Sequence, residues 1–313
     1  MKRFQKGIAV LLAAAVLCCT LLAGGCAPRR ETKAAYRIAT SFYPVYIMTK
    51  NITNGIEGVQ VTDMAGPQTG CLHDYQLQSK DMQTLSQADL FVINGAGMES
   101  FLTKVTDQLP GLAMLESTAG IARLHSGGDE HAHGEDGGAH DGAQADNPHM
   151  WVGISNYIRQ VENIAAGLER ADPPRARQYR ANADAYVQKL SDLRRRMHAA
   201  IDPLPNRDIV SFHEAFPYFA QEFGLHIVQT VQREPDSQPS ARELAQTIRL
   251  IRDSGVRAVF AEPQYAASAA QIIAQESGAG FYTLDPGATG PDTLDAYLDA
   301  MEKNMHTLQE ALA

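Results

Sequence analysis

The sequence has little of three things that would each indicate a particular class of protein. Positive charge is scarce, with 27 Lys and Arg against 36 Asp and Glu and a net charge of −9 over 313 residues. Nucleic-acid binding requires a concentrated basic surface that neutralises phosphates, so we expect no nucleic-acid partner. An apolar run of the roughly 20 residues that a membrane-spanning helix needs is also missing. Cysteine is rare, at four residues, and the position of each one decides its role.

Motifs of common hydrolases and nucleotide-binding proteins are missing as well. Zinc hydrolases with the His-Glu-x-x-His motif need a second His four residues after the first, but His213 is followed at that distance by Pro217. No Gly-x-Ser-x-Gly sequence is present. Gly95 and Gly97 lack the third glycine of a dinucleotide-binding loop, because Ser100 stands in its place. We therefore do not expect an enzyme.

The N-terminus has the pattern of a secretory signal. Lys2, Arg3 and Lys6 precede an apolar run over residues 8–23. This run is about 16 residues long, which favours a signal peptide over a membrane anchor. The sequence Leu-Ala-Gly-Gly that ends at Cys26 resembles a bacterial lipobox, in which the cysteine is lipidated and becomes the new N-terminus. The pattern predicts an extracytoplasmic protein that is lipid-anchored to the cell membrane through Cys26.

This processing would leave a single thiol. Residues 1–25 form the predicted signal peptide, so Cys18 and Cys19 are removed with it, and residues 26–35 read as a tether. Cys71 is then the remaining thiol, and no disulfide is expected within the mature chain. We interpret Cys71 as a small buried hydrophobic residue.

From Tyr36 onward, short β-rich segments alternate with helical patterns. This alternation is typical of βαβ units and parallel sheets. We predict strands at residues 36–40, 59–64, 88–93, 112–115, 208–212, 226–231, 258–261 and 280–284. We predict helices at residues 44–52, 79–87, 98–108, 155–170, 174–201, 215–223, 241–253, 266–276 and 293–312.

The predicted fold is therefore α/β, with two Rossmann-like lobes joined by one long rigid helix. The N-terminal lobe covers residues 36–172, the linking helix 173–203 and the C-terminal lobe 204–313. Asp172 is positioned to cap the linking helix, and the prolines after it are tolerated in a first turn. At 1.5 Å per residue, a helix over residues 174–201 would be about 42 Å long. Such a helix would hold the two lobes apart as a stiff spine.

One segment of the N-terminal lobe has an unusual composition. Residues 125–149 hold six of the acidic side chains, five of the ten histidines and six glycines, but no Lys or Arg. A segment with so little to bury is typical of disorder, so we expect a disordered loop over residues 126–147. Its imidazoles and carboxylates indicate a metal ion as the partner.

Three histidines and one aspartate follow predicted strands or begin the central helical region. They are His73, His149, His213 and Asp285, with spacings of 76, 64 and 72 residues. In open α/β sheets, ligands bind beyond the carboxyl ends of the strands. Three imidazoles and one carboxylate match the ligand preference of Zn²⁺. Taken singly, each residue has an ordinary explanation, and Asp285 before Pro286 also fits a turn or cap.

Five short strings in this order carry a resemblance to a known family. They are Gly-Cys-Leu-His73-Asp-Tyr-Gln-Leu, Asn-Pro-His149-Met-Trp151, Ser-Phe-His213-Glu-Ala-Phe, Phe-Ala-Glu262-Pro-Gln-Tyr and Tyr-Thr-Leu-Asp285-Pro. They resemble the metal-binding extracytoplasmic proteins of zinc and manganese ABC importers, from about Ile38 to the C-terminus. The His- and acid-rich insertion before the Asn-Pro-His string is similar to the zinc branch.

The resemblance implies two α/β lobes with the metal held in the cleft between them. It implies that His73, His149, His213 and Asp285 bind Zn²⁺ and that the protein, as a monomer, delivers the ion to an ABC permease and its ATPase. An imidazole at His213, where manganese members have a carboxylate, favours zinc. Some zinc members have a carboxylate directly before the first ligand, where this chain has Leu72, so the fourth ligand is Asp285 or water. Glu262 is assigned at most a hydrogen bond near the cleft.

The remaining loop histidines are His125, His131, His133 and His140. We expect them to form an auxiliary, low-affinity metal-binding loop, or alternatively a solvated insertion without a role. Alternatives for the whole protein are a manganese-binding homologue, a metal-binding surface adhesin and, less favoured, a zinc hydrolase. The hydrolase stays open because zinc held by three histidines can activate a water molecule.

Overall fold

Two four-stranded parallel sheets form the centres of the two lobes. The computed structural model describes residues 35–67, 69–72, 75–125, 146–231, 239–264 and 267–313. The first sheet has the order β2-β1-β3-β4, with β1 (Tyr36–Thr40), β2 (Val59–Asp63), β3 (Leu90–Ile93) and β4 (Met114–Glu116). The second has the order β6-β5-β7-β8, with β5 (Asp208–Ser211), β6 (His226–Thr230), β7 (Ala258–Ala261) and β8 (Gly280–Thr283). The predicted α/β fold is confirmed, and each predicted strand is present with small shifts at its ends.

One inner strand of each sheet is buried on both faces. All four residues of β3 and all four of β7 are buried. Strands covered by helices on both sides have such continuous apolar runs. In both sheets the second strand lies on one side of the first, and the third and fourth strands lie on the other side. This reversal places a crevice at the carboxyl ends of the strands, where ligands of α/β proteins bind.

Helices connect the strands, and two turns of 3₁₀ helix flank the central helix α5. In the first lobe the helices are α2 (Tyr43–Thr53), α3 (Ser79–Ser86) and α4 (Leu102–Gln108). The middle of the chain forms η1 (Met150–Val152), α5 (Ile154–Ala171), η2 (Pro173–Arg175) and α6 (Ala176–Ile201). In the second lobe they are α7 (Pro217–Phe223), α8 (Ala241–Ser254), α9 (Ser268–Ser277) and α10 (Ala296–Leu312). None of the helices in the described part of the chain is both long and apolar enough to cross a membrane.

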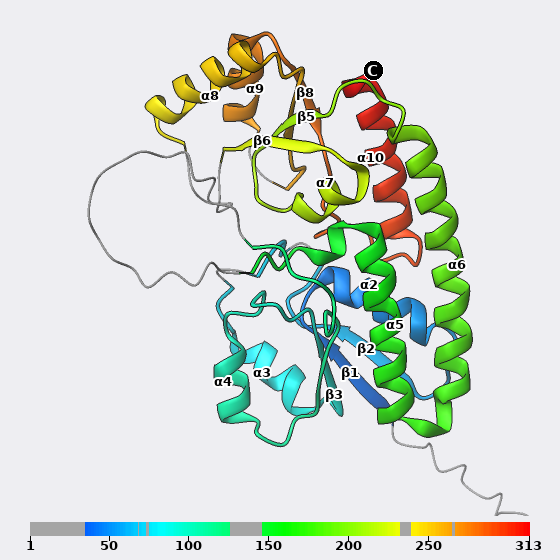
Figure 1. Cartoon of the computed structure of the whole chain (residues 1–313). Helices are drawn as coiled ribbons and strands as arrows, with labels where there is room; N and C mark the ends of the chain where they lie inside the picture. The colour runs from blue at the N-terminus through cyan, green and yellow to red at the C-terminus, as the bar shows by residue number, and fades with distance from the viewer. Residues whose placement is uncertain (1–34, 68, 73–74, 126–145, 232–238, 265–266) are drawn as a thin grey trace, which may run out of the picture. The chain divides into compact units, whose positions relative to one another are not determined.

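The long helix α6 contacts both lobes. Its 26 residues span about 39 Å. It lies alongside α5 and α10 and also packs against α2 (Figure 1). Asn182 donates hydrogen bonds to the carbonyls of Ile52 and Asn54 in the first lobe, at 2.9 Å each. Arg196 pairs with Glu302 of α10 at 2.7 Å. The helix therefore fixes both lobes along its length, as the sequence predicts.

The start of the long helix differs from the prediction in one detail. Asp172 does not cap the helix with its side chain. Its carboxylate instead accepts hydrogen bonds from Arg175 and from the Tyr179 hydroxyl, both at 2.7 Å. These stronger charge-assisted partners take the carboxylate away from the backbone N–H groups of the first turn.

Aromatic side chains join the two lobes close to the crevice. Trp151 is fully buried and donates from its indole nitrogen to the carbonyl of Pro286 at 2.9 Å. Tyr297 donates to the carbonyl of Trp151 at 3.0 Å and stacks on Tyr157, with ring centroids 3.5 Å apart. One apolar core therefore runs from the first lobe through these rings into the second. The predicted domain boundaries at residues 172 and 204 remain a prediction.

A second set of inter-lobe contacts joins α2 to the loop before α10. Tyr43 donates to the carbonyl of Pro291 at 2.8 Å, and Asn51 donates to the carbonyl of Leu294 at 2.8 Å. Tyr46 and Lys50 both bind the carboxylate of Asp292. These polar contacts, together with the packing of α6 against both lobes, restrict rotation of one lobe against the other.

Candidate metal site

Two of the predicted ligands lie face to face. His149 directly precedes η1, and His213 follows β5. Their ring centroids are 5.0 Å apart and their planes are nearly perpendicular, at 89°. Both side chains are buried, with 2% and 3% of their surface exposed. Residues separated by 64 positions in the sequence thus meet between the two sheets. His73 lies outside the described residues.

Asn147 fixes the orientation of His149. Its side-chain oxygen accepts a hydrogen bond from the backbone N–H of His149 at 3.0 Å and lies 3.0 Å from the ring nitrogen Nδ1. An oxygen that accepts from both groups requires the proton on Nδ1. The lone pair of the imidazole is then on Nε2, the nitrogen that a metal ion would bind.

The same asparagine connects the two histidine-bearing segments. Its Nδ2 donates to the carbonyl of Glu214, the residue after His213, at 2.9 Å. Its carbonyl accepts a hydrogen bond from Tyr218 of α7, also at 2.9 Å. The Asn-Pro-His string of the first lobe is therefore tied directly to the Phe-His-Glu string of the second.

Glu262 fixes the orientation of His213. The Nδ1 of His213 lies 2.8 Å from Oε1 of Glu262, and their side chains are 3% and 1% exposed. Glu262 follows β7, which pairs with β5 in the sheet, so the register of the two strands places these residues side by side. A carboxylate that accepts from Nδ1 holds the Nε2 lone pair of the imidazole toward a metal ion and makes it a stronger donor. A hydrogen bond near the cleft is the role that the sequence allows Glu262, but His213 is not predicted as its partner, because the two residues are 49 positions apart.

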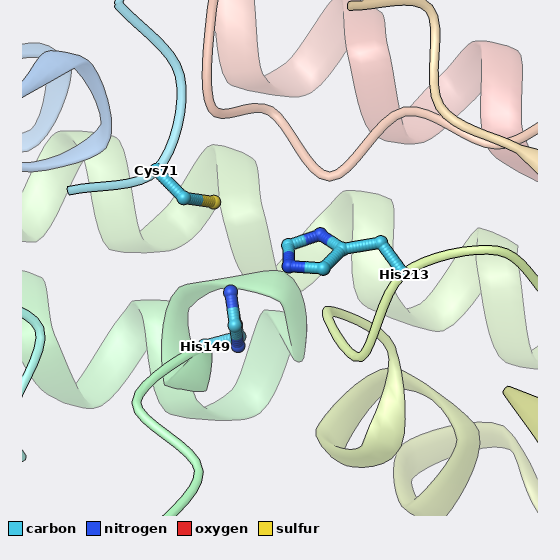
Figure 2. A group of neighbouring side chains, drawn as sticks. All are labelled: Cys71, His149 and His213. Atoms are coloured by element: carbon cyan, nitrogen blue, oxygen red, sulfur yellow. The ribbon is translucent and has the colours of Figure 1, made fainter. Parts of the chain in front are cut away.

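Cys71 is the third member of this cluster. One donor atom each from Cys71, His149 and His213 lies within 4.8 Å of the others, and this is the group of potential metal ligands found among the described residues. Figure 2 shows the sulfur and the two imidazole rings directed toward a common space. Cys71 is partly buried and packs against the hydrophobic core, in keeping with its interpretation as a small hydrophobic residue, but that interpretation misses its position beside the two imidazoles. The available signal is its place in the same short loop as His73.

Asp285 follows β8, as predicted, but it is not part of that group. Its Oδ1 accepts hydrogen bonds from the backbone N–H of Gly287 at 2.8 Å and from Gln264 at 3.4 Å. Asn304 holds its backbone on both sides. Burial raises the pKa of the Asp285 carboxyl, and the hydrogen bonds from Gly287 and Gln264 oppose that rise. These contacts place Asp285 in a turn, which is the alternative to a ligand role that the sequence leaves open for this residue.

The His- and acid-rich loop begins and ends at a defined base. His125 and Asp146 form an antiparallel bridge, and their side chains pair at 3.2 Å. His125 is largely exposed. The backbone N–H of Asn147 donates to the carbonyl of Leu124 at 2.7 Å. The Asp146 side of this base thus lies three residues before His149. His131, His133 and His140 lie outside the described residues, as does Cys26.

The fold and the cluster together define a class of protein, namely a two-lobed α/β protein with a group of side chains able to hold a metal ion at the carboxyl ends of its sheets. Comparison with models of protein families agrees with this class. Residues 38–311 match the model of the zinc-uptake complex component A, periplasmic. The chain belongs to this family, whose members are solute-binding components of zinc-uptake systems.

Relatives with assigned names are similar over most of this chain. The zinc-binding lipoprotein AdcA of Streptococcus pneumoniae (strain ATCC BAA-255 / R6) is 28% identical over 315 residues, which cover 98% of this chain and 61% of AdcA. The high-affinity zinc uptake system protein ZnuA of Bacillus subtilis (strain 168) is 28% identical over 320 residues, covering 99% and 98%. A crystal structure of ZnuA superposes with a TM-score of 0.75 at 27% identity, covering 89% of this chain and all of that one. This chain therefore spans about three fifths of AdcA.

Proposed function

We propose that this protein captures a zinc ion between its two lobes outside the cytoplasm and delivers it to an ABC permease driven by an ATPase. The observation that carries the proposal is the pair of buried imidazoles of His149 and His213. Each has its Nδ1 beside a side-chain oxygen, so each directs its Nε2 lone pair toward the other lobe. Imidazoles suit zinc better than manganese. The names of the relatives AdcA and ZnuA support zinc as the ion.

The proposed ligands are His73, His149, His213 and Asp285, with water as the alternative to Asp285. Cys26 is the proposed lipid attachment site, which would keep the monomer beside its permease in the membrane. The name of AdcA, a zinc-binding lipoprotein, supports the anchor.

Delivery would require only small movements between the lobes. The stacked Tyr157 and Tyr297, the Trp151 hydrogen bond to Pro286 and the spine α6 all resist wide opening. The ligands, in contrast, lie on short segments between strands and helices. A permease that displaces one of these segments would break the coordination without separating the lobes.

The test is zinc affinity measured by competition with a chelator. We expect one tight site in the wild-type protein, and loss of more than about 100-fold in affinity for His213→Ala or His73→Ala, which exceeds the effect of losing an outer partner. His226→Ala is the matched control, because His226 is exposed and pairs with Asp208 at the far end of β5. Unchanged affinity in the His213 variant would refute the proposed site.

A further inference from the structure

Cys71 faces the metal site although its neighbour in the sequence faces the core. Leu72 is fully buried, and its backbone N–H contacts the sulfur of Met98 at 3.4 Å. Cys71 is only partly buried, and its side chain points toward His149 and His213 (Figure 2). Core packing accounts for Leu72, whereas Cys71 packs only at the edge of that core and has its sulfur in the group formed with His149 and His213.

The three donors have the spacing of a site that a zinc ion could close. In a tetrahedral zinc site, with Zn–N of about 2.0 Å and Zn–S of about 2.3 Å, the donors lie roughly 3.3 to 3.6 Å apart. The donors of Cys71, His149 and His213 lie within 4.8 Å of one another. A bound ion would need them to approach each other by roughly 1.5 Å or less. Rotation of side chains is sufficient for a movement of this size.

We infer that Cys71 is a ligand of the transported ion, binding through its thiolate beside the two imidazoles. This inference rests on the proposed function and adds a donor to it. The thiol proton passes to solvent as the metal–sulfur bond forms. A sulfur donor favours zinc and other thiophilic ions and disfavours manganese, which prefers oxygen ligands. Cys71 is therefore a specificity-determining residue on the first lobe's side of the site.

Cobalt is the direct probe of a sulfur ligand. Co²⁺ replaces zinc in tetrahedral sites, and a thiolate ligand gives it a charge-transfer absorption in the near ultraviolet. We expect this band in the wild-type protein at one equivalent of Co²⁺, and we expect Cys71→Ser to bind Co²⁺ without it. Any other cysteine is present in both proteins, so the difference spectrum isolates Cys71.

The outcomes separate this inference from the proposed function. If both proteins bind one Co²⁺ and neither shows the band, or both show it equally, Cys71 is not a ligand, while the histidine site still stands. If the wild-type protein binds no Co²⁺ and no Zn²⁺, both proposals fail.

A second measurement tests specificity. We expect Cys71→Ser to lower Cd²⁺ affinity by on the order of tenfold or more, Zn²⁺ affinity by less, and Mn²⁺ affinity little, following the softness of each ion. Equal losses for all three ions would contradict the inference. Should the variant fail to fold, alkylation of the wild-type protein gives the same answer. Saturating Zn²⁺ should slow alkylation of Cys71 more than tenfold, and an unchanged rate would overturn the inference.

Discussion

The two halves of the metal site hold their histidines by different chemistry. In the first lobe, His149 rests on the neutral amide of Asn147. In the second, His213 rests on the carboxylate of Glu262, which is almost completely buried. Both partners place the imidazole lone pair on Nε2, but only the carboxylate brings charge.

This difference indicates that the two lobes contribute different effects to metal binding. A buried carboxylate beside an imidazole makes that imidazole a stronger donor and places negative charge close to an incoming cation. A neutral amide gives neither effect. Asn147 has a second hydrogen-bonding group, however, because its Nδ2 donates to the carbonyl of Glu214 in the other lobe. The second lobe therefore contributes electrostatic attraction, and the first contributes orientation and a link across the site.

Substitutions of the two partners should have unequal effects, and they give the largest change that we predict from this comparison. Glu262→Ala should lower zinc affinity by roughly 10- to 100-fold, the usual cost of losing an outer partner of a histidine ligand. Glu262→Gln keeps a hydrogen-bond acceptor without the charge and should lie in between. Asn147→Asp gives His149 a charged partner but places a carboxylate oxygen against the carbonyl of Glu214, so we expect no net gain in affinity from the added charge. Chelator competition measures all three.

The comparison would be wrong if Glu262→Gln matched the wild type. The charge would then be unimportant, and Glu262 would only orient the ring. Thr247→Ala in α8 is a suitable control, because Thr247 is buried and its hydroxyl donates a hydrogen bond to the carbonyl of Glu243 within the same helix, at 3.0 Å.

A smaller effect is expected from the His- and acid-rich loop, which belongs to the first lobe alone. We propose that His125, His131, His133 and His140 bind further zinc ions weakly. Deletion of residues 126–145 should remove these weak sites and change the affinity of the tight site by less than about threefold. The deletion must spare Asn147, because this residue orients His149.

The structure also supplies the design of the deletion. His125 and Asp146 form an antiparallel bridge, so an Asn-Gly turn can join them. Calorimetric titration with Zn²⁺ measures stoichiometry and affinity together. An unchanged stoichiometry would show that the loop is a solvated insertion without a role in metal binding.

The sequence predicts the architecture well because local patterns determine it. The alternation of β-rich and helical segments gives both sheets, and the Pro-Pro break marks the start of the long helix. The site is predicted in part. The positions of His149 and His213 follow from strand ends, which parallel sheets bring together. Glu262 and Asn147 are not predictable as partners, because a hydrogen bond between residues far apart in the sequence depends on strand register and loop conformation.

Cys71 shows a different limit of sequence reasoning. A single cysteine in an apolar context is usually a packing residue, and the sequence does not give the direction of its side chain. Its position beside His149 and His213 becomes apparent only in the structure. Asp285 shows the same limit in reverse, since a strand-end aspartate serves equally as a ligand or as a turn residue.

The last predicted effect concerns stability and not metal binding, and it comes from comparing a partly buried carboxylate in each lobe. Hydrogen bonds from Ser155, His198 and Arg194 outweigh burial and lower the pKa of Glu222 in the second lobe. Burial raises the pKa of Asp63, in the first lobe, to about 6. Glu222 therefore adds stability that is lost as pH falls. Asp63 adds stability that is present at low pH and lost as pH rises through about 6.

Asp63→Asn should remove the loss of folding stability that Asp63 causes as pH rises. We expect the metal-free variant to be more stable than the wild type by about 1 to 2 kcal/mol at pH 8. At pH 4 the gain should fall to about 0.5 kcal/mol or less, because Asp63 is then protonated in the folded protein and about half protonated in the unfolded one. The value is set below the roughly 3 kcal/mol that the pKa change implies, because the side chain is only partly buried and solvent screens it. Urea unfolding at the two pH values measures the difference, and Asp107→Asn, at an exposed position of α4, is the control. Zinc affinity should not change, because Asp63 is not part of the cluster of Cys71, His149 and His213. An equal gain at pH 4 and pH 8 would show that the ionisation of Asp63 does not cause the instability.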